Sequence, residues 1–417
     1  MTPALTSNAC TASKAMSIIS RQQRESRRLL MRVLHISGGN LYGGVETMLV
    51  TLARYRQVLP ALEQEFALCF EARLSTELGA TGVPVHVLGE VRTRRPFTVW
   101  RARRKLRELL RARQIDVAVC HLPWSQAIFG PAARHAGIPL VFWMHGTARG
   151  WHWLELWARL KPPDLTICNS HFTASTLVNL YPDLRFEVIY YPLASSAPGL
   201  SVAERAALRA ELRTPTDATV VFQASRMEAW KGHRQLLEAL ARLRELPGWV
   251  CWLAGGAQRP RERRYMERLE RAASAHGIVE RVRFLGERSD VPRILRAADI
   301  YCQPNTGPEP FGLAFVEALG VGIPVISSAI GGATEIIDDS CGILVEPGDV
   351  QALAGALRGL IEDPRERVRL GAAGPDRARE LCGLATQMPR LGQALKGLRD
   401  RSTSSGASSD QMLRASP

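Results

Sequence analysis

Short, continuous runs of apolar residues alternate along the chain with longer segments in which apolar residues recur at helical spacing. In the first half these runs span residues 32–37, 65–70, 83–88, 115–121, 139–145, 165–170 and 186–191. A continuous apolar run is typical of a strand buried on both faces, and alternation with helices favours a parallel sheet. We therefore predict an α/β domain whose sheet is covered by helices on both sides.

A second series of the same kind follows a polar segment. Its predicted strands span residues 218–225, 249–256, 281–287, 298–304, 323–329 and 342–347. A chain of 417 residues, of which 46% are hydrophobic, can supply two cores of ordinary domain size. We expect two domains of the same class.

Changes in composition along the sequence indicate the domain boundaries. We expect an N-terminal domain at 31–195, a linker at 196–216, a C-terminal domain at 217–383 and a helix at 384–400 that packs back on the N-terminal domain. The polar segments 1–30 and 401–417 are expected to be disordered. Met31 is a candidate for the true start of the protein.

Two loops that follow predicted strands are the first places to look for chemistry, because ligands of open α/β sheets bind beyond the carboxyl ends of the strands. In the loop 36–44, Gly43 and Gly44 precede a predicted helix whose free amides suit a phosphate. An ordinary tight turn explains these glycines equally well. In the loop 224–232, Arg226 and Lys231 offer two cations to an anion, with solvated surface charge as the alternative.

The segment 309–317, EPFGLAFVE, is the most specific local pattern. A helix that begins near Gly312 or Leu313 would place Glu309 on the loop before it and Glu317 one turn further along it. Carboxylates accept hydrogen bonds from sugar hydroxyls, and the amides of Phe311, Gly312 and Leu313 would add donors from the helix start. Helix capping is the structural alternative for Glu309.

Five motifs in this order, GGVE, HG, SRMEAWKGH, EPFGLAFVEALGVGIPVISS and GGATEIIDD, resemble those of glycosyltransferase family 4. The resemblance extends from about residue 32 to about residue 397. It implies a retaining enzyme of the GT-B fold, in which two Rossmann-like domains have parallel sheets that face a central cleft. It also implies a sugar-nucleotide donor.

The resemblance assigns roles to individual residues. Arg226 and Lys231 would neutralise the donor diphosphate, Glu317 would hold the ribose, and Glu309 with the backbone of Phe311 to Leu313 would hold the donor sugar. Gly43 and Gly44 would approach the phosphates from the N-terminal domain, and residues 287–291 would contact the base. Catalysis would then depend on Glu309, Lys231, Arg226 and His145.

Two histidines at strand ends are further candidates. His145, in the segment MHG, matches the family's histidine beside the donor sugar, and His121 is a candidate for the acceptor side. A buried histidine of the core is the alternative for each.

The sequence departs from the family's pattern in two places. Ser225 stands before Arg226 where relatives often have glycine, and the segment around Pro192 replaces a turn similar to Asn-Gly-Val-Asp. The second departure lies at the expected hinge between the domains.

The net charge of +14 indicates an anionic partner, which is a phosphorylated ligand, a membrane surface or a nucleic acid. Ten Lys or Arg residues lie between Arg92 and Arg113, on a predicted helix with apolar residues along one face. This helix could lie on an anionic membrane, or it could be an ordinary helix packed on the sheet. The eight cysteines are expected to be reduced, and no run of the sequence has the length and composition of a membrane span.

The predicted function is transfer of a sugar from a UDP- or GDP-sugar to a glycan or to a polyprenyl- or lipid-linked acceptor, in bacterial cell-surface polysaccharide or glycolipid biosynthesis. We expect a cytoplasmic enzyme, peripheral on the membrane, without cofactor or metal. One alternative is a sugar-nucleotide epimerase or hydrolase of the GT-B fold. Another is a nucleic-acid-binding protein, for which the sequence shows no base-reading motif.

Overall fold

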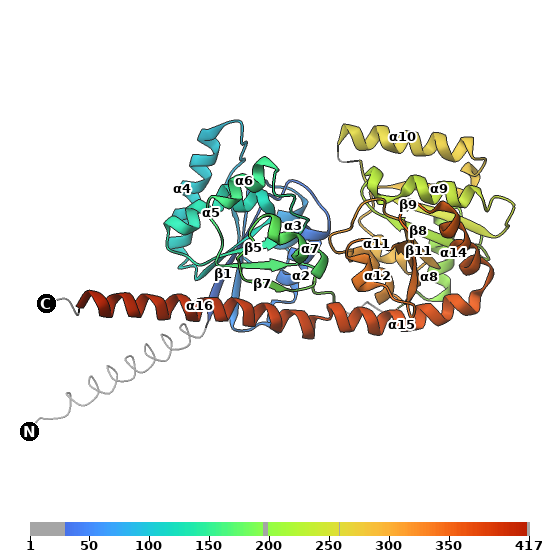
Figure 1. Cartoon of the computed structure of the whole chain (residues 1–417). Coiled ribbons are helices and arrows are strands. Elements are labelled where there is room, and N and C mark those ends of the chain that lie inside the picture. Colours follow the sequence, from blue (N-terminus) through green and yellow to red (C-terminus); the bar gives the residue numbers. More distant parts are fainter. Residues whose placement is uncertain (1–29, 195–198, 258, 415–417) are drawn as a thin grey trace, which may run out of the picture.

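A computed structural model describes residues 30–194, 199–257 and 259–414, and side chains as far as residue 401. The chain forms two α/β domains side by side, joined along one edge by a long C-terminal helical segment (Figure 1). This arrangement confirms the predicted fold class.

The N-terminal domain contains a seven-stranded parallel sheet in the order β3-β2-β1-β4-β5-β6-β7. Its strands are β1 (Met31–Ser37), β2 (Leu62–Leu68), β3 (Val85–Val87), β4 (Val117–His121), β5 (Leu140–Met144), β6 (Leu165–Cys168) and β7 (Phe186–Val188). Each lies within or overlaps a predicted apolar run. Every residue of β4 and β5 is buried, which explains why these runs do not alternate.

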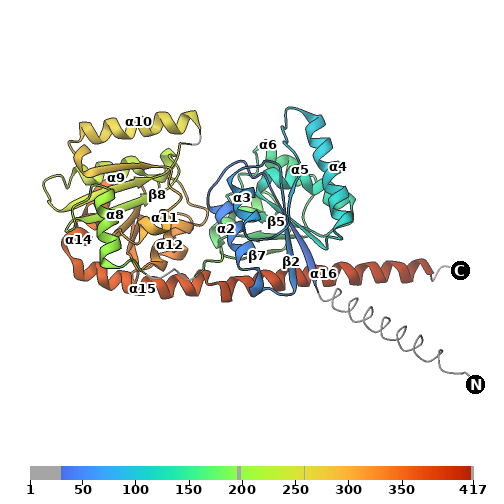
Figure 2. The ribbon, with the colours of Figure 1, turned by 180° about the vertical axis from the view of Figure 1, so that it is seen from behind.

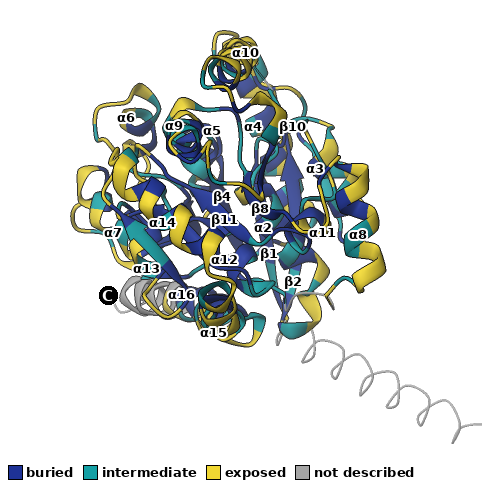
Figure 3. Ribbon diagram, turned by 90° about the vertical axis from the view of Figure 1, so that its right-hand side faces the viewer, coloured by how far each residue is buried: buried dark blue, intermediate teal, exposed yellow. Residues whose placement is uncertain are grey.

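The C-terminal domain contains a six-stranded parallel sheet in the order β10-β9-β8-β11-β12-β13. Its strands are β8 (Thr219–Ala224), β9 (Trp249–Ala254), β10 (Val282–Gly286), β11 (Ile300–Gln303), β12 (Val325–Ser328) and β13 (Gly342–Val345). The strands form the buried centre of the molecule, and the exposed surfaces belong mainly to the helices around them (Figure 3).

Helices cover both sheets. In the N-terminal domain they are α2 (Gly44–Arg54), η1 (Arg56–Val58), α3 (Arg73–Gly79), α4 (Pro96–Ala112), α5 (Leu122–His135), α6 (Trp153–Arg159), α7 (His171–Thr176) and η2 (Leu177–Asn179). In the C-terminal domain they are α8 (Val202–Glu211), η3 (Ala229–Lys231), α9 (His233–Ala241), α10 (Pro260–Ala275), η4 (Val279–Arg281), α11 (Val291–Leu295), α12 (Leu313–Gly320), α13 (Ala333–Ile336), α14 (Val350–Glu362) and α15 (Pro364–Cys382).

The segment predicted as a linker, 196–216, contains helix α8. Ser201 and Glu204 form a capping box at the start of this helix. The buried Arg209 on the same helix forms an ion pair of 2.6 Å with Asp299, which precedes β11. Most of this segment therefore belongs to the C-terminal domain, and residues 195–198 lie outside the described residues.

The last helix, α16 (Leu384–Arg414), runs back along the N-terminal domain (Figure 2). Its buried residues Leu391 and Leu395 belong to the same apolar cluster as Leu59 of that domain. The helix continues past the boundary at residue 400 that composition predicts, as far as Arg414. The predicted extension 1–30, apart from Leu30, and residues 415–417 lie outside the described residues.

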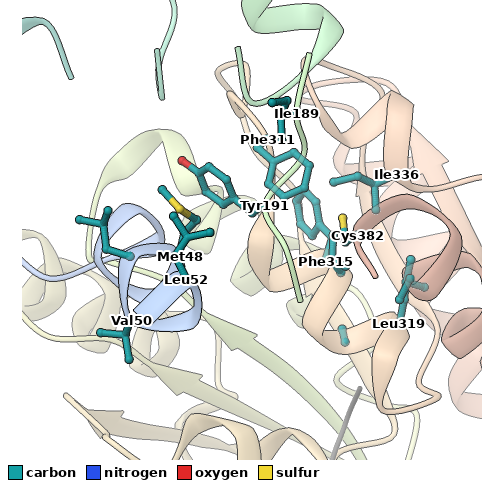
Figure 4. Packing of buried hydrophobic residues seen from close by; sticks show 14 of the residues in the cluster. Met48, Val50, Leu52, Ile189, Tyr191, Phe311, Phe315, Leu319, Ile336 and Cys382 are labelled. Atoms are coloured by element: carbon teal, nitrogen blue, oxygen red, sulfur yellow. The ribbon is translucent and has the colours of Figure 1, made fainter. Parts of the chain in front are cut away.

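The same apolar cluster crosses from one domain to the other (Figure 4). Met48 of α2 lies near Tyr191, and Tyr191 packs on Phe311, with ring centroids 5.0 Å apart. Phe315 continues the cluster into the C-terminal domain. The two domains are thus in direct contact at the carboxyl ends of their strands.

Among the described residues, none of the helices combines the length and apolarity needed to cross a bilayer. The cysteines in this part of the chain are buried and free.

Candidate active site

Lys231 and Glu309 come together where β8 and β11 end. The Lys231 ammonium lies 2.5 Å from Oε2 of Glu309, and each side chain is little exposed, at 13% and 12%. The two residues are 78 positions apart in sequence, but β8 and β11 are neighbours in the sheet. The two most specific motifs of the sequence therefore form one site.

Gly232 allows the loop after β8 to pack this closely. Its φ is +78°, and a Cβ there would lie 1.8 Å from the carbonyl oxygen of Pro304. The loop is fixed further by the amide of Thr306, which donates to the carbonyl of Trp230 at 2.8 Å. A side chain at position 232 would push Lys231 away from Glu309.

The Glu309 carboxylate is held through one of its two oxygens. Oε2 accepts from Lys231, from Nε2 of Gln303 at 3.1 Å and from Nδ2 of Asn305 at 3.1 Å. The structure records no hydrogen bond from a described residue to Oε1. The carboxylate is thus anchored on one side and can accept a ligand's hydroxyl on the other.

Arg226 and Trp230 complete the loop. Nη2 of Arg226 lies 3.2 Å from Oε2 of Glu228, and the Trp230 indole donates to the same oxygen at 2.9 Å. The Lys231 ammonium also lies 4.1 Å from the centre of the Trp230 ring. Both predicted phosphate-binding cations are therefore oriented by carboxylates before any ligand binds.

Helix α12 begins at Leu313, as predicted, with Gly312 at its N-cap. The φ of Gly312 is +112°, and a Cβ there would lie 2.3 Å from the ring of Phe315. The conformation and packing of its own helix therefore require glycine at this position. The amide of Phe315 donates to the carbonyl of Gly312 at 2.9 Å, whereas the structure records no carbonyl partner among the described residues for the amides of Leu313 and Ala314, which are thus available as donors.

Gly44 faces α12 from the N-terminal domain. A Cβ on Gly44 would lie 3.9 Å from Leu313 and 3.9 Å from Tyr191, so the predicted glycine loop and the predicted helix start are adjacent. The carboxylate of Glu46 lies beside Gly43 at the start of α2. Burial raises the pKa of Glu46, and the charge of Arg226 partly opposes that shift.

Glu317 lies on α12, one turn beyond its start. Burial raises the pKa of its carboxyl group to about 7. Burial raises the pKa of Tyr301, and the charges of Glu309 and Glu317 add to that shift. The structure records no hydrogen bond between Glu317 and another described side chain.

The predicted base-contacting loop, residues 287–291, lies at the same edge of the sheet. A Cβ on Gly256, which follows β9, would lie 2.7 Å from the carboxylate of Glu287. The predicted donor-site residues of the C-terminal domain thus follow β8, β10 and β11.

His145 and His121 belong to a buried hydrogen-bonded chain that the sequence did not predict. Nδ1 of His35 lies 3.0 Å from Nε2 of His121, whose Nδ1 lies 2.8 Å from Nε2 of His145. Nδ1 of His145 lies 2.7 Å from the Tyr191 hydroxyl, which also accepts from Asn169 at 3.2 Å. Each neutral ring has one donor and one acceptor, so the protons of the three rings must follow one direction along the chain.

These hydrogen bonds bear on both histidine predictions. His121 is completely buried with both ring nitrogens in hydrogen bonds, which favours the alternative of a core histidine over contact with the acceptor. His145 is 6% exposed and uses both nitrogens within the protein. It positions Tyr191, which lies between Gly44 and Phe311.

Family models match both domains. A model described as Glycosyltransferase Family 4 matches residues 42–193, and one described as Glycosyl transferases group 1 matches residues 204–377. Over 294 residues the chain is 31% identical to a GDP-mannose-dependent alpha-(1-6)-phosphatidylinositol monomannoside mannosyltransferase of Mycolicibacterium smegmatis, covering 66% of this chain and 74% of that relative. The chain belongs to glycosyltransferase family 4.

Another relative matches over a shorter length. The lipopolysaccharide core biosynthesis glycosyltransferase LpsE of Rhizobium meliloti is 35% identical over 167 residues, or 40% of this chain and 46% of LpsE. That match spans about half of the relative's length.

The fold of the chain is also similar to that of solved structures. The crystal structure of Anabaena Alr3699/HepE in complex with UDP and glucose is 25% identical, with a TM-score of 0.76 over 88% of this chain and 99% of that one. A glycosyltransferase from Rickettsia africae, 20% identical, shares the fold with a TM-score of 0.78 over 88% and 98% of the chains. The chain is thus a glycosyltransferase of the GT-B fold.

Sequence reasoning missed several polar residues of the site. Gln303 is the last residue of β11 and Asn305 lies just beyond it, at the edge where ligands of such sheets bind, so their position could have suggested them. Tyr191 lies in the segment that departs from the family's pattern. Its contact with His145 spans 46 residues, and no local pattern predicts it.

Glu317→Gln should stabilise the enzyme at alkaline pH and weaken donor binding. The folded-state pKa of about 7 is above the ordinary 4.5, so the native state binds more protons and stability falls as pH rises between these values. Urea denaturation should show the variant more stable than wild type by roughly 1–3 kcal/mol at pH 8, with no gain at pH 4. An equal gain at both pH values would contradict this account. Glu362→Gln, at an exposed position on α14, is the control.

The histidine chain should make the fold sensitive to acid. Burial lowers the pKa of His35 to about 4 and that of His145 to about 3, and it also lowers the pKa of His121. The unfolded chain therefore binds more protons below pH 6.5, and stability falls as pH decreases from 6.5 towards 4.

His121→Gln should reduce this sensitivity while lowering stability at pH 7.5. Between pH 6 and pH 5, the decrease in the free energy of unfolding, measured by urea denaturation, should be smaller in the variant than in wild type by about 1.4 kcal/mol per pH unit. His135→Gln, which changes an exposed histidine, should keep the wild-type slope. If the free energy of unfolding depended on pH equally in all three proteins, the buried histidines would not be the cause of the acid sensitivity.

Proposed function

We propose that this enzyme is a retaining glycosyltransferase that takes its sugar from a UDP- or GDP-sugar held by Arg226, Lys231, Glu309 and Glu317. The observation that carries the proposal is the state of Glu309. One oxygen of its carboxylate is fixed by three donors, and the other is left for a sugar hydroxyl beside the start of α12.

The proposed catalysis is electrostatic. When the sugar–phosphate bond breaks, negative charge develops on the departing diphosphate. Arg226, Lys231 and the starts of α2 and α12 would stabilise that charge, so the proposal includes no metal or other cofactor. Relatives support the donor class, because one is named as GDP-mannose-dependent and HepE was solved with UDP and glucose.

Retention of configuration is proposed to follow a front-face route. The acceptor hydroxyl would attack on the side from which the diphosphate leaves, and a phosphate oxygen would take the hydroxyl proton. Glu309 then acts as a binding and charge-stabilising residue, since its carboxylate is paired with the Lys231 ammonium.

We propose a lipid-linked or glycan acceptor, with the enzyme on the cytoplasmic face of an anionic membrane and a role in cell-surface glycolipid or polysaccharide synthesis. Relatives named for phosphatidylinositol mannoside and for lipopolysaccharide core support this acceptor class. The N-terminal domain also exposes aromatic rings beside arginines. On α4, Phe97 is 67% and Trp100 is 52% exposed, and the two rings stack 5.8 Å apart.

Helix α4 has one buried face and one exposed face. Val99, Ala102, Leu106 and Leu110 are buried against the domain, so the helix does pack on the sheet. Phe97 and Trp100 lie outside that face, and Arg104 lies 6.0 Å from the Trp100 ring. Aromatic rings with basic neighbours suit the interface of an anionic membrane.

Lys231→Ala and Glu309→Gln should each lower sugar transfer by 10²-fold or more, because each removes a charge beside the reacting bond. UDP-, GDP- and ADP-sugars would first be screened for thermal stabilisation of the protein, since a bound donor raises the unfolding midpoint. Transfer from the best donor to vesicles containing phosphatidylinositol, or to lipopolysaccharide core, would then be measured.

Lys161→Ala, at an exposed position in the N-terminal domain, is the matched control and should transfer at the wild-type rate. Near-normal turnover by Lys231→Ala, with a normal circular dichroism spectrum, would refute the assigned site. Turnover of the donor to an isomer without any acceptor would instead identify an epimerase.

Wild-type enzyme should co-sediment with phosphatidylglycerol vesicles at low salt and less so at high salt. Phe97→Ser combined with Trp100→Ser should lower the bound fraction several-fold, since two rings would no longer enter the interface. Val368→Ser, which changes an exposed apolar residue of the other domain, should bind as wild type does. Absence of binding by wild type at low salt would rule out the membrane proposal.

A further inference from the structure

The segment Gly331–Gly332 contacts the backbone of the donor-site loop within the C-terminal domain. The amide of Gly332 donates to the carbonyl of Glu309 at 2.7 Å, and Glu309 and Gly331 form a parallel β-bridge. A Cβ on Gly331 would lie 2.5 Å from the Glu309 carbonyl, and one on Gly332 would lie 2.4 Å from the carbonyl of Phe311. These two glycines thus define the backbone position of the loop 309–312.

Glu335, three residues further on, reaches across to the N-terminal domain. Its carboxylate accepts from the amide of His171 at 2.9 Å and from that of Phe172 at 2.6 Å, at the start of α7. It also accepts from the Tyr190 hydroxyl at 2.9 Å. A carboxylate at a helix start is favoured by the free amides and by the helix dipole.

The start of α7 also holds the donor loop directly. The carbonyl of Pro310 accepts from the hydroxyl of Ser170 at 2.5 Å and from that of Thr173 at 3.0 Å. Both hydroxyls belong to the N-terminal domain, whereas Pro310 lies between Glu309 and Phe311 in the C-terminal domain. The donor loop is therefore bonded on one side to its own domain and on the other side to the opposite domain.

Tyr190 joins these two sets of contacts. Its ring stacks on Phe311 with centroids 5.6 Å apart and planes 25° apart, while its hydroxyl binds Glu335. Tyr190 lies in the segment before Pro192, where this sequence departs from the family's usual turn. One partner of the contact thus comes from the segment that departs from the family's pattern, and the other, Glu335, comes from the motif GGATEIIDD.

We infer that Glu335, Tyr190 and the start of α7 form an interdomain latch that couples contact between the domains to the placement of Glu309. This inference rests on the donor site proposed above. When the domains separate, Glu335 loses three donors and the Pro310 carbonyl loses two. The donor loop then keeps only the contacts within its own domain, those of its backbone with Gly331 and Gly332 and those of the Glu309 carboxylate. Glu335 and Tyr190 are then positioning residues, which act on the donor through Glu309.

The latch predicts that Glu335→Gln weakens both domain contact and donor use. The neutral amide loses the charge-assisted bonds to the α7 amides, which corresponds to a loss of about tenfold or more in the equilibrium for domain contact. Donor KM should rise by a similar factor, with a smaller fall in kcat. Tyr190→Phe, which keeps the ring on Phe311 and removes one bond, should change both quantities in the same direction but less.

The experiment measures the distance between the domains in full-length protein by double electron–electron resonance. Spin labels would be placed at Arg101 on α4 and Glu267 on α10, both exposed, after Cys10→Ser and with the buried thiols retained. Distances would be recorded without ligand and with the donor that stabilises the protein most. Donor KM and kcat would be measured on the unlabelled proteins, and circular dichroism would verify folding.

Glu335→Gln should move a fraction of the ligand-free molecules to longer distances, and Glu362→Gln, the exposed control, should leave the wild-type distribution unchanged. Wild-type distances in both Glu335→Gln and Tyr190→Phe would overturn the latch. A longer distance with an unchanged donor KM would overturn the coupling to Glu309. If wild type used no nucleotide sugar at all, the proposed function would fail, whereas the ligand-free distances would still decide whether the latch exists.

Discussion

The ion pair between Lys231 and Glu309 is the constraint on which the rest of the site depends. It joins the loop after β8 to the loop after β11, and it holds one oxygen of Glu309 while leaving the other for a ligand. Gly232 adopts a positive φ in a crowded position so that these loops can approach, and Gly312 does so where α12 begins. A charged pair that is mostly shielded from water is sensitive to the loss of either partner, because the remaining charge would be left uncompensated.

Contact between the domains extends this constraint. The loop 309–312 is bonded to Gly332 in its own domain and to Ser170 and Thr173 in the other, and Phe311 packs against Tyr191. Tyr191 is fixed in turn by the chain of three histidines that begins at β1. The interior of the N-terminal domain thus helps to determine the geometry of a site whose charged residues belong mostly to the C-terminal domain.

Much of this could be predicted from local patterns. The continuous apolar runs correspond to strands of both sheets, and the start of α12 follows from a glycine before a helical repeat. The linker could not be bounded in this way, because α8 belongs to the C-terminal domain through a long-range ion pair between Arg209 and Asp299. The histidines were recognised as candidates, but their roles depended on neighbours brought together from β1, β4 and β5.

The sequence by itself determined the two-domain fold and the family, and it indicated the charged residues of the proposed donor site, because hydrophobic periodicity and short motifs are local properties. Only the tertiary structure decided that Glu309 is anchored through a single oxygen, that His121 is buried in a hydrogen-bonded chain, and that Glu335 contacts the opposite domain. Each of these depends on atoms far apart in sequence, whose distances are set by strand order and by packing between the domains.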